Sequence, residues 1–431
     1  MTEQVYNIAD HVRLTAVTTD KFKMSRLSFS FIDSADRTES PKTALMLATL
    51  MRGSEKYPTV SDIKRRLDDL YGCSVSIRSH VDGERHVFKI TCEMLGERFV
   101  PEGNNENIID GTLDLIGDIL LNPKRDTEGK IDVFYLESEK KIAIDAIKSK
   151  INDQRAYADE KCREMLYCDS SFGISVDGNE EIISSFTQDD IESRRKMLLE
   201  SLPVECFYVG PEEGNTIKEK LKNFFSKLYS DIERNPKQIK YGYRAYRYDS
   251  CFSSREECMP VSQGRLSIGF MTDTVFGDEN YYRSLIFNEV FGGGSTSKLF
   301  MNVREKKSLC YYCSSLYSPT SGAVIVNCGI KPENKEAAFD EVMNQLDLLY
   351  EGHVSENELS VAKESIFNSI HQIEDSTSAI EAYLFREIMA EKKIPIDEYV
   401  HGFEDVTLED VKQYAKSVKL CTSYFLNGNL E

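Results

Sequence analysis

The six histidines of this chain are the first candidates for chemistry, because a zinc ion held on a helix needs two ligands one turn apart on the same face. No two of them lie three or four residues apart. His371 and Glu374 have helical spacing, but without a third ligand the pair is better explained as a polar helix face. The histidine pattern therefore predicts that this chain holds no metal and no other cofactor.

The cysteines give one further pattern. Cys310 and Cys313 are separated by two residues, which is a weak zinc or redox signal without a second pair or nearby histidines. The chain has 11 cysteines, an odd number, and many of them lie within apolar, strand-like runs. This usage is typical of reduced, buried thiols in a cytoplasmic protein, so we interpret the pair as structural.

A glycine run with serine, threonine and lysine after it could cradle a phosphate. Gly292-Gly293-Gly294 is followed by Lys298, but the glycine-to-lysine spacing differs from that of a phosphate-binding loop. We therefore interpret Gly292, Gly293 and Gly294 as a hinge between two helices. The sequence also lacks a nucleophile elbow and a dinucleotide-binding fingerprint.

These residues belong to a chain with an internal repeat. Arg26–Phe31 returns as Arg265–Phe270, and the strand-like Cys206–Gly210 returns as Tyr424–Gly428. Strand, helices, hairpin and helices follow in the same order in both copies. We therefore predict the α+β class, with two homologous domains of like fold, each a mainly antiparallel sheet packed with helices.

The length of the chain fits this division. Its 431 residues are enough for two domains with cores of their own. We expect an N-terminal domain over 1–231 and a C-terminal domain over 249–431. The segment 232–248 is rich in Lys, Arg and Tyr and contains Pro236, so we interpret it as the linker.

One helix of the first domain is well marked. Ser40-Pro41 predicts its start, with the serine as N-cap and the proline in the first turn, and Gly53 predicts its end. Apolar residues lie on all sides of the helix between these positions. Such a helix should be deeply buried.

The charge of the chain excludes some partners. Its formal net charge is −19, which argues against nucleic acid or an anionic membrane. The start of the sequence has no basic region followed by an apolar stretch, and no run approaches 18 apolar residues. We therefore expect a cytoplasmic protein that binds neither nucleic acid nor membrane.

Several ordered motifs resemble one known family. Arg52–Pro58 followed by Ile63–Gly72 and, in the second half, Phe287–Phe300 and Val303–Tyr311 are similar to signatures of the pitrilysin, insulinase and mitochondrial-processing-peptidase family. The resemblance covers nearly the whole chain and is nearest to a bacterial branch of zinc-less members. It implies the two-domain fold of these metallopeptidases and a role in handling peptides.

The zinc motif is where this chain departs from the family. In active members a His-x-x-Glu-His helix precedes the segment that resembles Arg52–Pro58. The equivalent positions here are Ala44, Leu47 and Ala48, and the position of the distant glutamate ligand falls on Ala146. None of these side chains can bind a metal or act as a base, whereas a catalytic zinc needs three protein ligands. The resemblance therefore implies a degenerate zinc motif.

The resemblance also points to Arg304 and Tyr311, which have the spacing of an arginine and a tyrosine that contact substrate opposite the zinc in this family. A guanidinium and a phenol can both donate to a peptide carbonyl or to a developing oxyanion. The alternative is that Arg304 caps a surface helix and that Tyr311 belongs to a strand core. Within the surrounding signature, we favour the substrate-contacting role.

In heterodimeric members of the family, one subunit supplies the zinc and the other supplies the Arg/Tyr pair. We therefore expect a non-catalytic subunit of a heterodimeric zinc metallopeptidase, which binds peptide and completes the active site of a homologous, zinc-bearing partner. The alternative is a catalytically inert peptide-binding or scaffold protein, either a homodimer or a core subunit of a complex, with no protease partner. Substrate, cleavage specificity and partner identity stay open at this point.

Overall fold

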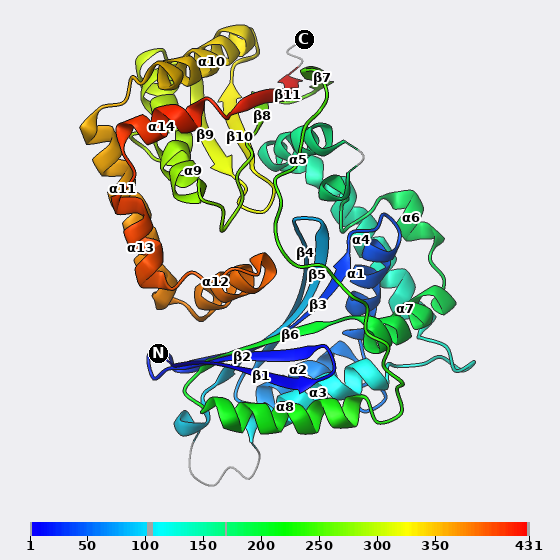
Figure 1. The fold of residues 1–431 in the computed structure, drawn as a ribbon. Helices are drawn as coiled ribbons and strands as arrows, with labels where there is room; N and C mark the ends of the chain where they lie inside the picture. Colours follow the sequence, from blue (N-terminus) through cyan, green and yellow to red (C-terminus); the bar gives the residue numbers. More distant parts are fainter. Residues whose placement is uncertain (1, 101–106, 169, 429–431) are drawn as a thin grey trace. The chain divides into compact units, whose positions relative to one another are not determined.

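The computed structural model describes residues 2–100, 107–168 and 170–428. The chain divides into two compact units, each with one β-sheet (Figure 1). The first unit is Met1–Lys148, Ile174–Lys240 and Ser376–Ala382, and the second is Ser149–Gly173, Tyr241–Asp375 and Tyr383–Glu431. Two short segments thus lie in the unit formed mainly by the other half of the chain. The domain bounds 1–231 and 249–431 stay predictions.

The first unit contains a six-stranded sheet in the order β1-β2-β6-β3-β5-β4. All neighbouring strands are antiparallel except β2 and β6. The strands are β1 (Thr2–Ala9), β2 (Val12–Thr18), β3 (Met24–Ser34), β4 (Ser74–Asp82), β5 (Arg85–Leu95) and β6 (Val204–Gly210). The helices are α1 (Glu39–Leu50), α2 (Val60–Asp69), α3 (Ile108–Leu121), α4 (Val133–Ser149), α6 (Glu180–Ser185), α7 (Gln188–Ser201) and α8 (Gly214–Leu228).

The start of α1 differs from the prediction by two residues. Ser40 is not the N-cap, because α1 begins at Glu39 and Thr38 occupies the cap position. The amides of Thr38 and Glu39 donate to the Asp36 carboxylate at 2.8 and 2.7 Å. Asp36 thus satisfies helix amides that lack an intrahelical acceptor, and these bonds, that of Glu39 first, lower its pKa.

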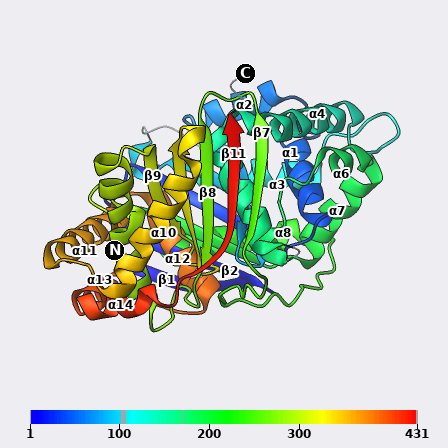
Figure 2. The same ribbon diagram turned by 90° about the horizontal axis from the view of Figure 1, so that it is seen from above.

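The second unit contains a five-stranded sheet in the order β7-β11-β8-β10-β9. Figure 2 shows β7, β11 and β8 side by side. The strands are β7 (Ser253–Met259), β8 (Gly264–Met271), β9 (Cys310–Tyr317), β10 (Ala323–Ile330) and β11 (Lys419–Gly428). The helices are α5 (Gln154–Tyr167), α9 (Tyr281–Asn288), α10 (Lys335–Glu351), α11 (Glu356–His371), α12 (Thr377–Ala390), α13 (Ile396–Glu404) and α14 (Leu408–Ala415), and the first residues of α12 belong to the first unit.

The two sheets share one topology, which confirms the predicted α+β fold with two similar sheets. The order β6-β3-β5-β4 in the first sheet matches β11-β8-β10-β9 in the second. In each sheet the strand next to this set, β2 or β7, is parallel to its neighbour. The repeat found in the sequence corresponds to β3 and β8 and to β6 and β11, which are antiparallel neighbours in both sheets.

Each unit has an apolar core of its own. In the first unit, α1, α3, α7 and α8 bury their apolar faces with the inner strands in one large cluster. In the second unit, α5 packs against β8 and β11, so that Ala158, Cys162 and Leu166 share a cluster with Ile325 and Tyr424. Among the described residues, no helix has the length and apolar character needed to span a bilayer.

Candidate functional site

The three positions of the zinc motif lie on α1. Leu47 is only 1% exposed and belongs to the core of the first unit. Ala44 and Ala48 are half-buried and, being four residues apart, lie on one face of the helix. A pair of metal-binding side chains would have the right spacing here, but the helix presents methyl groups and packs Leu47 into the core.

The fourth position lies on α4. Ala146 and its neighbour Asp145 are both exposed. Glu139, on the same helix, is 6% exposed and is held by an ion pair with Arg52, which follows α1. This carboxylate therefore fixes α4 to the end of α1 instead of being available as a metal ligand.

The side chains at these positions do not fit a zinc ion. Ala44, Leu47, Ala48 and Ala146 offer no lone pair, whereas a catalytic zinc needs three donors. Across residues 2–100, 107–168 and 170–428, no group of three or more His, Cys, Asp or Glu side chains is arranged to hold a metal. The zinc helix of the family is kept here as a packing element.

Arg304 lies in the π-helical segment η5 (Leu299–Lys306) of the second unit. Its side chain is 41% exposed, and its Nε lies 3.6 Å from a carboxylate oxygen of Glu305. The guanidinium lies 4.6 Å from the centre of the Phe300 ring. Because an exposed ion pair contributes at most about 1 kcal/mol, Arg304 can readily exchange Glu305 for another acceptor.

Tyr311 lies at the start of β9, directly after a tight turn. Ser308 has a positive φ of 52°, and its amide donates to the carbonyl of Arg304 at 3.0 Å. This turn ends η5 and leads the chain into β9, an edge strand of the sheet. The Tyr311 side chain is 57% exposed. The interpretation of Tyr311 as strand core is therefore wrong, while its contact with substrate stays a prediction.

The glycine run lies beside β9. Gly292 is buried in the π-helical turn η4 (Glu289–Gly293). A Cβ at Gly292 would lie 2.7 Å from the backbone nitrogen of Ser315 on β9, whereas one at Gly294 would meet a Glu289 carboxylate oxygen at 2.8 Å. Gly292 thus permits a close approach of backbone to backbone. The hinge role of the run stays a prediction.

Lys298, which follows the glycine run, is engaged elsewhere. Its Nζ lies 2.6 Å from a carboxylate oxygen of Glu358 on α11. A phosphate-binding loop needs this lysine free to reach the phosphate. Lys298 is thus held in an ion pair, and the interpretation that this segment is not a phosphate cradle stays a prediction.

Two hollows of the second unit lie away from Arg304 and Tyr311. A groove of about 480 Å³ lies between α11 and α13, with Phe367 and Phe403 among its lining residues. A hollow of about 750 Å³ is lined by Ala245–Ser250 and residues at the start of β11. The lining of neither includes the two candidate side chains.

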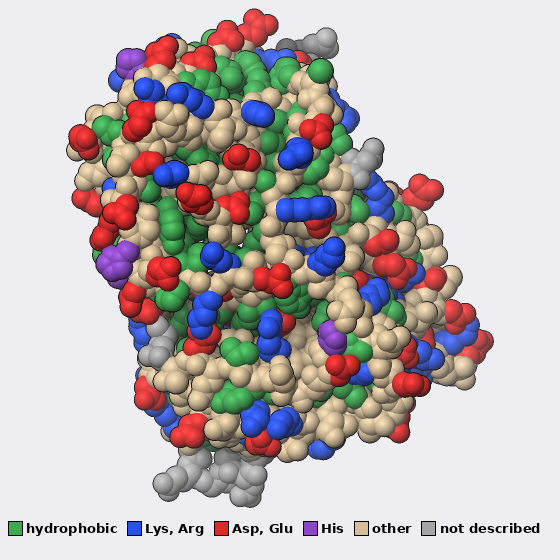
Figure 3. Space-filling model, in the orientation of Figure 1, with side chains coloured by type: hydrophobic (Ala, Val, Ile, Leu, Met, Phe, Trp, Pro, Cys, Tyr) green, Lys and Arg blue, Asp and Glu red, His purple; other side chains and the backbone are tan. Residues whose placement is uncertain are grey.

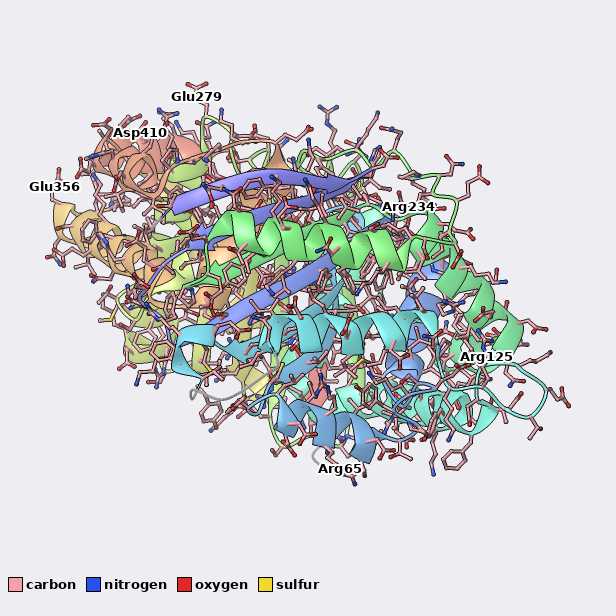
Figure 4. All side chains as sticks on the ribbon, turned by 90° about the horizontal axis from the view of Figure 1, so that it is seen from below. Arg65, Arg125, Arg234, Glu279, Glu356 and Asp410 are labelled. Carbon is pink, nitrogen blue, oxygen red and sulfur yellow. The ribbon has the colours of Figure 1, made fainter. Side chains whose placement is uncertain are left out.

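Charged side chains of both signs are interspersed on the surface. Figure 3 shows acidic and basic groups scattered over the face in view, without a continuous basic area. On the face in Figure 4, Arg65 and Arg125 are each 3.4 Å from a carboxylate, those of Asp62 and Glu192. Proteins that bind nucleic acid gather such cations into a patch, and the expectation that this chain binds no nucleic acid stays a prediction.

One notable residue, Cys328, was missed in the sequence. The interpretation of Cys310 and Cys313 as structural rested on the absence of a second pair of this spacing and of nearby histidines, and it did not consider Cys328 as a partner. Cys328 on β10 pairs directly with Cys313 on β9. The signal was the hairpin itself, because two strands joined at Tyr317–Ala323 place residues equally distant from the turn opposite each other.

The fold and the lost zinc ligands define a class of protein, and a comparison with family models names it. Residues 185–366 match the model described as the Peptidase M16 inactive domain. This match and the relatives below show that the chain is similar to inactive members of the M16 peptidases. The family resemblance found in the sequence is thereby confirmed.

Similar proteins extend over the whole chain. The chain is 28% identical over 423 residues to the "Probable inactive metalloprotease YmfF" of Bacillus subtilis strain 168. The aligned residues cover 97% of this chain and 96% of that protein. The crystal structure of a conserved protein from Enterococcus faecalis V583 matches with a TM-score of 0.90 and 23% identity over 100% of this chain and 99% of that one. The structure of a peptidase M16 inactive domain from Pseudomonas fluorescens matches with a TM-score of 0.78 and 16% identity over 100% and 99%. The two structures support the fold.

Proposed function

We propose that this chain is the non-catalytic subunit of a heterodimeric zinc metallopeptidase. It has no peptidase activity alone, pairs in the cytoplasm with a homologous subunit that carries zinc, and binds peptide substrates beside that zinc. The observation that supports the proposal is a contrast between two sites on one chain. Leu47, at the zinc motif, is 1% exposed, whereas Tyr311, in the Arg/Tyr pair, is 57% exposed.

The proposed task of Arg304 and Tyr311 is to donate hydrogen bonds to the carbonyl oxygen of the scissile peptide bond. The guanidinium offers several N–H donors in a fixed plane, and the phenol offers one O–H donor. Both become more effective as negative charge develops on that oxygen, and losing one such donor typically costs on the order of 3–4 kcal/mol of transition-state stabilisation. The partner supplies the metal and the base that this chain lacks.

The first experiment is affinity purification of the chain from its native cell, followed by mass spectrometry of what remains bound. The proposal predicts one homologous chain with His-x-x-Glu-His at equal stoichiometry, and peptide hydrolysis by the pair but by neither chain alone. Recovery of the chain alone, or with unrelated proteins only, would favour the inert binding or scaffold protein instead.

The role of the two side chains is tested within the purified pair. Arg304→Ala and Tyr311→Phe should each lower kcat/KM for peptide hydrolysis by about 100-fold, with unchanged complex formation. Arg255→Ala is the matched control, since Arg255 is 58% exposed and lies 3.9 Å from Glu257 on the same unit. Equal activities in all three variants would exclude Arg304 and Tyr311 from the reaction.

A further inference from the structure

Two thiols face each other across the sheet of the second unit. Cys313 on β9 lies directly opposite Cys328 on β10 in the antiparallel register. Their Sγ atoms are 3.0 Å apart, and both residues are buried. Antiparallel partners have Cα atoms about 4.5–5.5 Å apart, which lies within the span of a disulfide. A bond between these sulfurs can therefore form without a shift of the backbone.

A β-bulge adds a third thiol to this pair. Tyr312 pairs with Gly329 and Cys310 pairs with Ile330, so Tyr311 has no partner in the register of β10. In a regular strand, residues three apart point to opposite faces. The extra residue reverses the alternation, so that Cys310 and Cys313 are both buried while Tyr311 is exposed. The thiols of Cys310 and Cys313 are hydrogen-bonded to each other.

Of Cys310 and Cys313, we expect Cys310 to react more readily. The hydrogen bond with Cys313, and next the Arg304 guanidinium, lower the pKa of Cys310 despite its burial. The same bond, the contact with Cys328 and burial raise the pKa of Cys313 well above its usual range. Since the thiolate is the nucleophile, a small oxidant that reaches this cluster would react first at Cys310.

We propose that Cys310, Cys313 and Cys328 form an oxidation site that takes up a small peroxide and stores the oxidation as a Cys313–Cys328 disulfide. The proposal does not depend on the proposed peptidase role, because the register, the bulge and the three thiols belong to this chain alone. It replaces the interpretation of the C-x-x-C pair as purely structural.

The chemistry balances in three steps with hydrogen peroxide as the oxidant. The Cys310 thiolate attacks one oxygen, an S–O bond forms, the O–O bond breaks, and hydroxide leaves and takes up a proton as water. Cys313 loses its proton and attacks the Cys310 sulfur, which expels the remaining oxygen as a second water and forms a disulfide. Cys328 then loses its proton and attacks Cys313, and the Cys310 sulfur leaves as a thiolate. Two thiols are oxidised and one peroxide is reduced to two waters.

The test is a disulfide map of the full-length, pre-reduced chain after treatment with one equivalent of hydrogen peroxide. Free thiols are alkylated, the chain is unfolded and digested with chymotrypsin, and the peptides are analysed without reduction. Chymotrypsin is needed because no lysine or arginine lies between Cys310 and Cys328, so trypsin leaves all three in one peptide. The proposal predicts linked peptides that contain Cys313 and Cys328.

Variants separate the steps. Cys310→Ala should slow disulfide formation by roughly tenfold, because the more reactive thiolate is lost. Cys328→Ala should instead trap the bond between Cys310 and Cys313. Cys251→Ala is the control, since Cys251 is exposed and removed from the cluster in sequence, and it should leave the rate unchanged.

Two outcomes would overturn the proposal. One is a map in which Cys313 and Cys328 remain alkylatable while the exposed Cys168, Cys251 or Cys258 are oxidised. The other is a folded Cys310→Ala variant that forms the disulfide as fast as the wild type. The wild-type map decides the matter even where a substitution unfolds the chain, because it needs no variant.

Discussion

Leu47 occupies a position of the zinc motif but packs into the core of the first unit. The family motif has a glutamate here, yet Leu47 is buried in the core formed by α1 and the sheet of the first unit. With alanines at 44 and 48, a carboxylate at 47 would have neither a metal nor a metal-binding side chain beside it. A buried charge without a partner is costly. Once the metal-binding side chains at 44 and 48 are absent, an apolar side chain at 47 is therefore more stable than a carboxylate.

Restoring the glutamate alone should therefore destabilise the chain. Leu47→Glu removes a buried aliphatic side chain and introduces an unpaired carboxyl, and we expect a loss of about 3–5 kcal/mol in the free energy of unfolding. Ala48→Glu, at a half-buried position of the same helix, is the matched control and should lose less than half as much. Denaturant unfolding followed by circular dichroism measures both. Equal midpoints for Leu47→Glu and wild type would contradict the assignment of α1 as a core element.

At the scale of elements, the contact between η4 and β9 positions the segment that carries Arg304 and Tyr311. Gly292 allows η4 to approach the backbone of Ser315. The Ser315 hydroxyl also donates to the side-chain oxygen of Asn288 at 2.8 Å, which joins the end of α9 to the same strand. The geometry of the turn into β9 therefore depends on a position where a side chain does not fit.

Gly292→Ala should disturb this contact. The added methyl group meets backbone that cannot rotate away, so we expect a loss of about 1–3 kcal/mol in stability. Gly294→Ala is the control, because the close neighbour of its Cβ would be the end of the Glu289 side chain at 2.8 Å, with backbone no nearer than 4.0 Å, and it should be close to neutral. Thermal unfolding of the two variants separates these effects. A Gly294→Ala variant less stable than Gly292→Ala would show that the packing of η4 on β9 is not the constraint.

At the scale of the molecule, the second unit is completed by a segment from far away in the sequence. Residues 149–173 contain α5, which covers β8 and β11 and shares the apolar cluster of Ile325 and Tyr424. A fragment with only the C-terminal half of the chain lacks this helix. Its sheet would expose the apolar face that α5 covers.

Fragments test this arrangement directly. Residues 241–431 alone should aggregate or bind a hydrophobic dye, because the face of β8 and β11 is uncovered. The same fragment with residues 149–173 fused through a glycine-rich linker should be more soluble and show a cooperative thermal transition. Size-exclusion chromatography and dye fluorescence compare the two. If 241–431 behaves as well without α5 as with it, the helix is not part of the core of the unit.

Local patterns determined much of this protein from its sequence. The strands β3, β6, β8 and β11 follow from alternation and from the repeat, because side-chain period depends only on neighbouring residues. The degenerate motif at Ala44, Leu47 and Ala48 follows from residue identity, since an aliphatic side chain has no lone pair for a metal.

Only the tertiary structure decided which residues meet. The exposure of Tyr311 and the burial of Cys310 depend on a bulge opposite β10, and the approach of Cys313 to Cys328 depends on the hairpin register. The inclusion of α5 in the second unit depends on which apolar faces cover each other. Such pairings minimise exposed apolar surface and satisfy backbone hydrogen bonds over the whole chain. The repeat and the lost ligands could be predicted, and the hairpin offered a signal for the pairing of Cys313 with Cys328. The bulge that adds Cys310 to this pair and the shared helix could not be predicted, because no local stretch of sequence contains that information.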